Sequence, residues 1–507
     1  MLILYALARP LLAPDTAVLV NDTFATTDGS GFDRCSDIRS CRTTEEIIYS
    51  CIAVVFICTW VAIHPNIPRK FDFRDGKEIV RNSEYPSVHS AVVTLQNILF
   101  MLLALIVPEL IIMWAMRQWF AARKIAEKYK KYNWTKTHGF FVVMGGFALY
   151  DGDKFLHTLE DEESFTEEEE AVANKIDEFI KGYLKIKEEQ ASVGSIVSRP
   201  DGPTSRLLPD RSEASCMLEF LLQRKLISVT EDEIKDKGKS DALSKFLAIG
   251  QTAWFIVQCI ARGVEGISIT NLEILTVAFA LLNFGTYFFW LDKPQRIRFP
   301  IKINYQNQSS GGGGTAGSKS WGLGWIISGL QAIWDWFQAI GREIGSNWKF
   351  LYNYSPLIFP LRIITYPLWT LFIQSIDLAS GQSPYQTGLK KDPWHLYVSV
   401  ISIAVIFGAI HCIPWAFTFP SHTEQIMWRV CALGVTCFPV LGIVLVFVDD
   451  LVESTWGLRL FIVGGVIGPI FYAIARITLI ILALMELRAL PTSAHQTVEW
   501  TTLIPHI

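Results

Sequence analysis

The sequence predicts an all-α, polytopic membrane protein with seven transmembrane helices, two long extramembrane inserts and one further segment that is a candidate for an eighth span. Half of the 507 residues are apolar and only 19% are charged, a balance outside that of soluble globular domains. Uncharged runs of about 20 residues, the length that crosses a hydrocarbon core, recur along the chain. Tryptophan, of which there are 17 residues, gathers near the ends of these runs, where its amphipathic ring favours the membrane interface.

Charge balance and cysteine spacing exclude several classes of function. Lys and Arg number 45 against 49 Asp and Glu, and no basic block is dense enough to bind a run of phosphates, which excludes nucleic acid as a partner. The nine Cys form no CxxC pair and no Cys/His ladder, so neither a zinc site nor a redox motif is expected. We predict no cofactor, and we expect the lipid bilayer and a lipophilic small molecule as partners.

Seven runs meet the criteria of length and polarity for a membrane span. Capping boxes, in which Ser or Thr precedes Glu by three residues, mark the start of three of them at Thr43, Thr270 and Ser421. The eighth segment, Leu357–Ile373, contains two prolines and an arginine, which favours a re-entrant or interfacial piece over a full span. The seven predicted spans are Ile47–His64, Ala91–Met116, Leu243–Ala261, Asn271–Trp290, Leu396–Ile413, Trp428–Val448 and Leu460–Met485.

The spans divide the chain into membrane and extramembrane parts. The first insert should contain an amphipathic helix opened by a capping box at Thr166. In the second insert, the Trp-rich stretch 320–344 is typical of a helix that lies in the membrane interface or packs on the protein's own loops. In chain order the predicted parts are an amino-terminal segment (1–46), spans 1 and 2 (47–119), an acidic insert with a flexible linker (120–242), a hairpin of spans 3 and 4 (243–290), an insert with a Gly-rich linker (291–395), spans 5 to 7 (396–487) and a tail (488–507).

The sequence contains opposing signals about sidedness. Lys and Arg cluster beside both inserts, so the positive-inside rule predicts that the inserts are cytosolic, and seven spans would then put the amino terminus in the cytosol as well. The weakly signal-like stretch 1–13, the sequon at Asn21 and the pair Cys35 and Cys41 instead favour a non-cytosolic amino terminus. The sidedness therefore stays open. We expect a multi-pass integral membrane protein of the plasma membrane or of an endomembrane.

Ionisable residues inside a span are costly to bury, so each is a candidate functional group. Glu109 follows Pro108, where a protonated carboxyl could instead bond a carbonyl freed at the proline kink. His411 lies near the end of the fifth span, where a packing role is the alternative. Arg476 lies well inside the seventh span and needs a carboxylate, a phosphate or water beside it. We interpret Glu109, His411 and Arg476 as candidate catalytic groups that offer an acid, a base and an anion-holding cation.

The third and fourth spans form a predicted hairpin with a polar stripe on each helix. Facing stripes would line a ligand pocket, although hydrogen bonds between the helices would explain the same pattern. Glu273 could also close its own capping box or pair with Arg262 across the turn. The candidate pocket residues are Gln251, Gln258, Arg262, Glu273, Asn283 and Tyr287.

One acidic motif suggests a metal site at the end of the sixth span. Asp449 and Asp450 are followed one turn later by Glu453, an arrangement that can hold Mg²⁺ against a diphosphate. An acidic helix end in a short loop is the alternative, because no second motif of this kind occurs on another span.

Several strings resemble a large family of fungal polytopic membrane proteins of unassigned function. They are Thr59-Trp60 with Ile63-His64-Pro65-Asn66-Ile67-Pro68, Pro108-Glu109 with Arg117-Gln118-Trp119, His138-Gly139-Phe140-Phe141 with Met144-Gly145-Gly146-Phe147, Gln251-Thr252 with Trp254-Phe255 and Arg262, Ile410-His411-Cys412 with Phe419-Pro420-Ser421, Glu424 and Trp428-Arg429, and Ala475-Arg476. The resemblance covers the spans and leaves out the inserts. It implies a fungal, membrane-embedded protein and carries no reaction.

Three functions from different classes are consistent with these features. A membrane-embedded enzyme acting on a lipophilic small molecule would use Glu109, His411 and Arg476 in a polar intramembrane cavity. A proton-coupled small-molecule transporter is the second, although the sequence has no internal repeat of the kind that transporters show. A receptor or scaffold without chemistry is the third.

Overall fold

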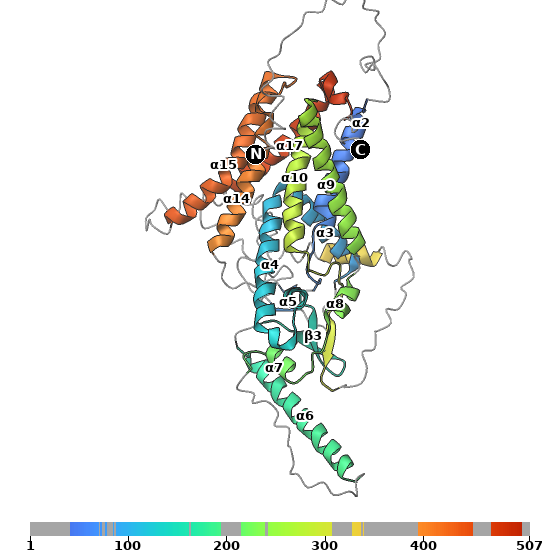
Figure 1. Cartoon of the computed structure of the whole chain (residues 1–507). Coiled ribbons are helices and arrows are strands. Elements are labelled where there is room, and N and C mark those ends of the chain that lie inside the picture. Colours follow the sequence, from blue (N-terminus) through green and yellow to red (C-terminus); the bar gives the residue numbers. More distant parts are fainter. Residues whose placement is uncertain are drawn as a thin grey trace, which may run out of the picture.

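The computed structural model describes residues 41–69, 71–72, 77–78, 85, 88–161, 164–193, 214–238, 242–306, 327–335, 338, 394–449 and 468–498. These residues form a bundle of long apolar helices and, at one end of it, a smaller domain that contains a β-sheet (Figure 1). The long helix α4 (Pro108–Lys128) runs from the bundle into the smaller part. We call the two parts the helical bundle and the insert domain.

Among the described residues, five helical segments are long and apolar enough to cross a membrane, and the first, third, fourth, fifth and seventh predicted spans fall on them. The chain therefore has several helices that can span a bilayer. The segments are Thr44–Val61, Lys245–Glu265, Asn271–Phe289, Val398–Ala416 and Ile470–Ala489. They belong to α2 (Thr44–Phe56) with the π-helix η2 (Ile57–Val61), α9 (Ala242–Glu265), α10 (Asn271–Phe289), α14 (Trp394–Ile410) with η5 (Ile413–Ala416), and α17 (Gly468–Glu486) with η7 (Leu487–Ala489).

The remaining two predicted spans differ from a straight apolar helix. The sixth lies within α15 (His422–Asp449), which contains Pro439, and its crossing of the membrane stays a prediction. The second is broken into α3 (Ser90–Ile106) and α4, whose axes differ in direction by 112°. Pro108 has no N–H and disfavours a helical residue before it, and Val107 accordingly takes φ −135° and ψ 66°. The predicted second span, Ala91–Met116, is therefore not one continuous helix, and its crossing of the membrane also stays a prediction.

The insert domain corrects the prediction of an all-α protein. Strand β3 (Phe147–Asp151) pairs antiparallel with β4 (Lys154–Thr158) and parallel with β5 (Ile301–Asn304), in the order β4-β3-β5. β3 is buried over most of its length, and its continuous apolar run is typical of a strand covered on both faces. Because β5 follows α10, the two predicted inserts contribute to one domain. A short hairpin of β1 (Phe71–Asp72) and β2 (Lys77–Glu78) lies apart from this sheet.

Short helices pack the sheet against α4. In α5 (Lys136–Val143), Gly139 lies so close to α4 that a Cβ there would be 2.2 Å from the Ala122 carbonyl oxygen. The predicted amphipathic helix is α6 (Glu167–Val193), whose capping box at Thr166 and Glu169 is confirmed. Figure 1 shows α6 projecting from the domain. The other elements are η3 (Lys130–Tyr132), α7 (Met217–Gln223) and α8 (Glu231–Lys237).

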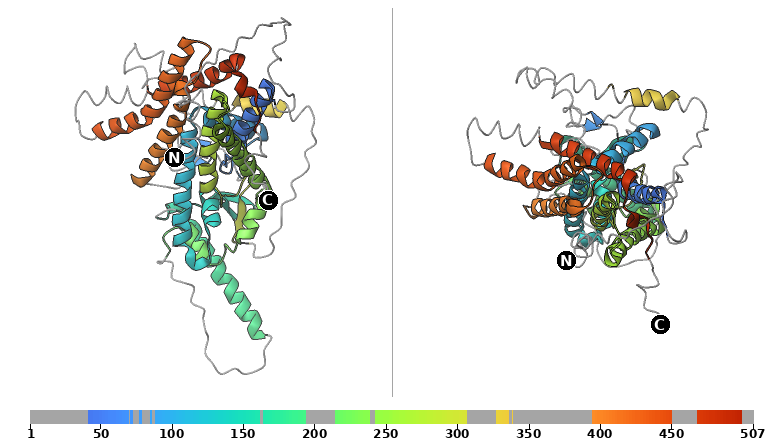
Figure 2. Two further views of the ribbon diagram at one scale, coloured as in Figure 1. Left: turned by 45° about the horizontal axis from the view of Figure 1, so that its top comes forward. Right: turned by 90° about the horizontal axis from the view of Figure 1, so that it is seen from above.

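The two ends of the described chain meet at the face of the bundle opposite the insert domain. Cys41 pairs with Gln496 as an antiparallel bridge, and the Arg42 N–H donates to the His495 carbonyl over 2.7 Å. The tail that carries this contact includes η8 (Thr492–His495) and follows α17 directly. The blue start of α2 and the red end of the chain accordingly lie together in Figures 1 and 2.

Several predictions concern residues outside the described ranges. They include the eighth segment 357–373, the Gly-rich linker, and the first part of the seventh predicted span. Within the Trp-rich stretch, residues 327–335 are helical and present Ile327, Leu330 and Trp334 to the outside.

Candidate functional site

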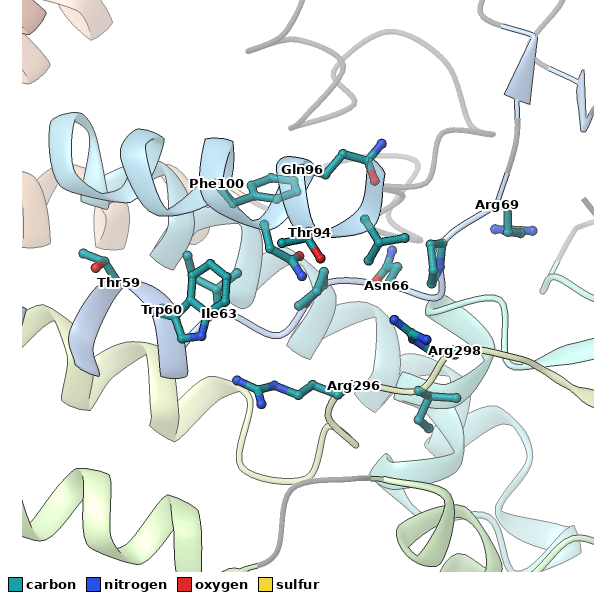
Figure 3. A pocket seen from close by; sticks show the side chains of 15 residues that line it. Thr59, Trp60, Ile63, Asn66, Arg69, Thr94, Gln96, Phe100, Arg296 and Arg298 are labelled. Atoms are coloured by element: carbon teal, nitrogen blue, oxygen red, sulfur yellow. The ribbon is translucent and has the colours of Figure 1, made fainter. Parts of the chain in front are cut away.

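A cavity of about 450 Å³ lies where the helical bundle meets the insert domain. Figure 3 shows it between η2, α3 and the segment that follows α10. Its lining combines aromatic and aliphatic side chains with amides, hydroxyls and three arginines. The lining residues are Thr59, Trp60, Ile63, Pro65, Asn66, Pro68, Arg69, Val93, Thr94, Gln96, Asn97, Phe100, Arg296, Ile297 and Arg298.

The three arginines differ in burial and in whether an acidic residue neutralises their charge. Arg69 is buried, packs on Gly145, and lies 3.8 Å from the Glu160 carboxylate. Arg296 and Arg298 are exposed, and neither forms an ion pair with any of the described acidic residues. Since the lining contains no carboxylate, the cavity has an excess of positive charge at its open side.

The backbone at Arg296 has a conformation that side chains rarely adopt. Its φ is 58°, in the left-handed region that favours glycine. Strained residues of this kind concentrate at ligand-binding positions, where the surrounding structure holds them. Figure 3 shows Arg296 on the wall opposite Trp60, with its side chain extended along the cavity.

A buried lysine supports the wall of the cavity from behind. Lys293 is only 1% exposed, and its Nζ donates to Asn66 Oδ1 over 3.1 Å, to Gln118 Oε1 over 2.7 Å and to the His64 carbonyl. The ammonium also lies over the rings of Trp114 and Trp290, contacts that stabilise a cation. This cage fixes Asn66, which faces the cavity.

Burial shifts the titration of two groups in this cage. The pKa of Lys293 is well below its usual range, because burial disfavours the charged form and Lys245 adds a like charge. Burial likewise holds the pKa of His64 well below its usual range, with further lowering by Lys245 and Lys293. His64 is therefore neutral at physiological pH. Its Nδ1 lies 2.7 Å from the Ala62 carbonyl, so Nδ1 carries the proton and Nε2 the lone pair.

The three predicted catalytic residues come together in a second cluster, inside the bundle. Arg476 is fully buried, and its Nη1 lies 2.7 Å from Nε2 of His411. Its other nitrogens point to the Leu105 and Ile106 carbonyls at the end of α3, and its guanidinium lies over the Phe407 ring. These are the carbonyls that the helix break leaves without intrahelical donors. Arg476 is thus buried among protein groups, while the carboxylate, phosphate or water expected beside it from the sequence stays a prediction.

The predicted carboxylate partner of Arg476 is not in contact with it. Glu109 instead accepts a hydrogen bond from the Tyr472 hydroxyl, and its second oxygen is buried without a described partner. The other candidate, Glu486, accepts from the Asn271 N–H over 2.8 Å. A neutral imidazole, two carbonyls and aromatic rings therefore surround the cation.

The predicted pocket on the hairpin is only partly assembled. Gln251 is exposed and Gln258 half-buried, because α9 buries the face one position further along, with Thr252, Phe255 and Cys259. Gln251 and Gln258 therefore lie off the buried face of α9, whereas Arg262, near the end of the same helix, is buried. Asn283 and Tyr287 of α10 are buried.

Arg262 and Glu273 join a network at the far face of the bundle. The predicted pairing is confirmed at 3.9 Å, and Arg42 forms a closer, two-pronged contact with the same carboxylate at 2.5 and 3.0 Å. Glu273 also closes its capping box with Thr270. Arg262 donates further to the Gln496 and Ala494 carbonyls, so this network fastens the tail.

The predicted metal motif falls at the edge of the described chain. Asp449 is the last residue of α15, while Asp450 and Glu453 lie outside the described residues. Within the described residues, no group of three or more potential metal ligands is close enough to hold an ion.

Sequence reasoning missed the arginine-lined cavity. Arg296 and Arg298 belong to a Lys/Arg cluster that sequence reasoning used only to predict sidedness. Asn66 appeared only in a motif that resembles a known family. The available signal was the density of Arg and Lys immediately after α10, combined with the Pro-rich segment after η2.

Comparison with known proteins yields one match. Residues 197–310 match a family of unknown function, DUF8562. This segment contains α7 to β5, and therefore Lys293, Arg296 and Arg298. No curated protein and no solved structure matches the chain.

Proposed function

We propose that this chain is a six-span integral membrane protein that binds a phosphate-bearing amphiphile in the arginine-lined cavity. The spans would be α2, α9, α10, α14, α15 and α17, and α3 with α4 would form a re-entrant pair. The observation that supports this count is the pairing of Cys41 with Gln496. Two residues paired on one face of the bundle require an even number of crossings between them.

The ends of the broken pair support its re-entrant character. Ser90 begins α3 beside the cavity, and Lys128 ends α4 inside the insert domain. Both ends therefore lie on the side of the insert domain. The tip, with Pro108 and Glu109, lies among the spanning helices, where irregular backbone is tolerated because protein surrounds it.

This arrangement reconciles the two opposing signals of sidedness. Arg123, Lys128, Lys235 and Arg298 all lie at the insert end of the helices, which favours the cytosol for that end. Cys41 at the opposite end is disulfide-bonded, and disulfides persist in oxidising compartments. An even number of spans would put both tails on the same side. With the Lys/Arg clusters in the cytosol, that side would be non-cytosolic and the cavity would lie at the cytosolic membrane surface.

The chemistry of the lining supports an anionic amphiphile. Trp60, Ile63 and Phe100 offer apolar surface, while the guanidinium forks of Arg296 and Arg298 match the geometry of a phosphate. The lining residues include no carboxylate, His, Cys or Lys. They thus supply binding groups and no general base that could activate the hydroxyls of Thr59 and Thr94, so we propose binding in preference to catalysis.

Lipid binding to protein in phosphatidylcholine nanodiscs, titrated with short-chain phosphatidic acid and followed by native mass spectrometry, tests the proposal. We expect Arg296→Gln and Arg298→Gln each to weaken binding by about 10-fold, since a charge-assisted hydrogen bond contributes about 1.5–3 kcal/mol. The matched control is Arg123→Gln, an exposed arginine of α4 that pairs with Glu127.

Competition distinguishes the source of the phosphate. Glycerol 3-phosphate should compete poorly, because it lacks the chains that fill the apolar part of the cavity. Equal binding of phosphatidic acid by all three variants would overturn the proposal. Full competition by glycerol 3-phosphate would identify a soluble phosphate as the ligand instead.

A further inference from the structure

Three buried side chains near the end of α10 that leads to the insert domain carry hydrogen-bonding atoms without described partners. They are Nε2 of His64, the hydroxyl of Tyr287, and both side-chain atoms of Asn283. The residues are 0%, 2% and 4% exposed. Buried polar atoms are nearly always hydrogen-bonded, and apparent exceptions commonly mark a water molecule or another small guest.

These atoms belong to one region of the interior. The His64 and Tyr287 rings meet edge to face with centroids 6.1 Å apart. Asn283 precedes Tyr287 by one helical turn, so both side chains lie on the same face of α10. That face packs against α2 and α9, where the Cys58 thiol contacts the Thr252 hydroxyl.

The donors and acceptors in this region are chemically complementary to water. His64 Nε2 presents a lone pair, because Nδ1 carries the proton, and so requires a donor. The Tyr287 hydroxyl and the Asn283 amide can each donate and accept. A water molecule also donates and accepts, and it is small enough to enter between closely packed helices.

A π-helix separates this region from the arginine-lined cavity. The residues of η2 contact both regions. Thr59 and Trp60 line the cavity (Figure 3), while Cys58 faces Thr252 on the other side. Single-turn π-helices are frequent at functional sites. The Lys293 ammonium bridges the two spaces, because it bonds both the His64 carbonyl and the cavity residue Asn66.

We infer that His64, Asn283 and Tyr287 bound an internal chamber that holds ordered water molecules in the half of the helical bundle next to the insert domain. The water bridges His64 Nε2 to the Tyr287 hydroxyl and continues to the Asn283 amide. It supplies a polar interior next to the cavity and does not require the cavity to bind an amphiphile. The chamber and the proposed function can therefore fail separately.

X-ray hydroxyl-radical footprinting of the full chain tests the chamber, because radiolysis of bound water modifies the side chains that contact it. We expect Tyr287 to be modified at a rate at least 5-fold above that of Tyr129. Tyr129 is a matched control, since it is 0% exposed and its hydroxyl is bonded to Asp161 over 2.7 Å. Modification of Tyr287 no faster than Tyr129 would overturn the inference.

Substitutions give a second test, because the change in Tm has opposite signs for a hydrated and a dry chamber. In a hydrated chamber Tyr287→Phe removes a hydrogen bond and lowers Tm, whereas in a dry chamber it removes an unpaired hydroxyl and raises Tm. Asn283→Leu should displace water and slow the modification of Tyr287 at least 2-fold. Thr286→Val controls for disturbance of α10, because that hydroxyl is bonded to the Leu282 carbonyl over 3.1 Å.

Discussion

Nη1 of Arg476 lies 2.7 Å from Nε2 of His411, so a buried cation has a neutral ring as its nearest side-chain partner. His411 Nδ1 lies 2.8 Å from the Phe407 carbonyl and therefore carries the proton, which leaves Nε2 to accept from Arg476. The same guanidinium reaches the Leu105 and Ile106 carbonyls and so caps the end of α3 at the helix break, while His411 holds the guanidinium in place. The stability of the re-entrant pair should depend on this contact.

A double-mutant cycle measures that dependence. Removing His411 alone, as in His411→Leu, leaves the guanidinium with an unpaired donor and should destabilise the protein by about 2–3 kcal/mol. Arg476→Leu together with His411→Leu should be less destabilised than the sum of the single variants, because neither partner is then left unpaired. Thermal unfolding in detergent gives the four values. Additive effects would show that the two residues do not stabilise each other.

Arg476→Lys should restore only part of the stability lost in Arg476→Leu. An ammonium lacks the planar fork that reaches His411 and the α3 carbonyls at once. Unfolding temperatures of the two variants, at equal expression in membranes, check this. A lysine variant as stable as the natural protein would show that only the charge matters.

The hydrogen bond from Tyr472 to Glu109 should persist when the carboxyl becomes an amide. Glu109→Gln keeps an accepting oxygen and should lower the stability by less than about 1 kcal/mol, whereas Glu109→Leu leaves the Tyr472 hydroxyl unpaired and should cost about 1–3 kcal/mol. Urea or thermal unfolding distinguishes them. Equal losses for Gln and Leu would indicate that Arg476 needs an ionised carboxylate nearby.

Glycan mapping tests the six-span arrangement. Both tails should be non-cytosolic, so expression in a eukaryotic host should attach a glycan at the Asn21 sequon, which lies outside the described residues. Asn133 is exposed and also starts a sequon, yet it should stay unmodified if the insert domain is cytosolic, as we propose. Gel mobility of Asn21→Gln and Asn133→Gln after glycosidase treatment reports both. A glycan at Asn133 would refute the arrangement.

The pKa of His64 predicts a pH dependence of stability. Its folded pKa lies well below the usual 6.5 because of burial, so the unfolded state binds a proton more readily. Stability from this group is fully present above about pH 6.5 and falls by up to about 1.4 kcal/mol per pH unit below it. His64→Gln should flatten the decline of Tm between pH 6.5 and 5. An unchanged slope would show that His64 does not control it.

The sequence by itself determined that the chain has helices able to span a membrane and determined most helix positions, because these follow from local properties. Apolar runs of spanning length placed both ends of α9 and α10 within a few residues, and the carboxyl-terminal end of α17 within one residue. The capping boxes at Thr43 and Thr270 located helix starts through bonds between residues three apart. The need of Arg476 for polar partners inside the protein followed from the high energy of an unpaired charge in hydrocarbon.

Only the tertiary structure decided which distant groups meet. Pro108 signalled a kink, but whether α4 continues or turns back depends on the packing of α4 in the insert domain. β5 alternates apolar and polar residues over only four positions, and its partner β3 is about 150 residues away, beyond the reach of a local pattern. One residue of helical phase separates the exposed Gln251 from the buried Thr252. The cavity is lined by three segments, and none of them has a recognisable binding motif by itself. A binding site depends on which residues are close in space, and spacing along the chain does not give that information.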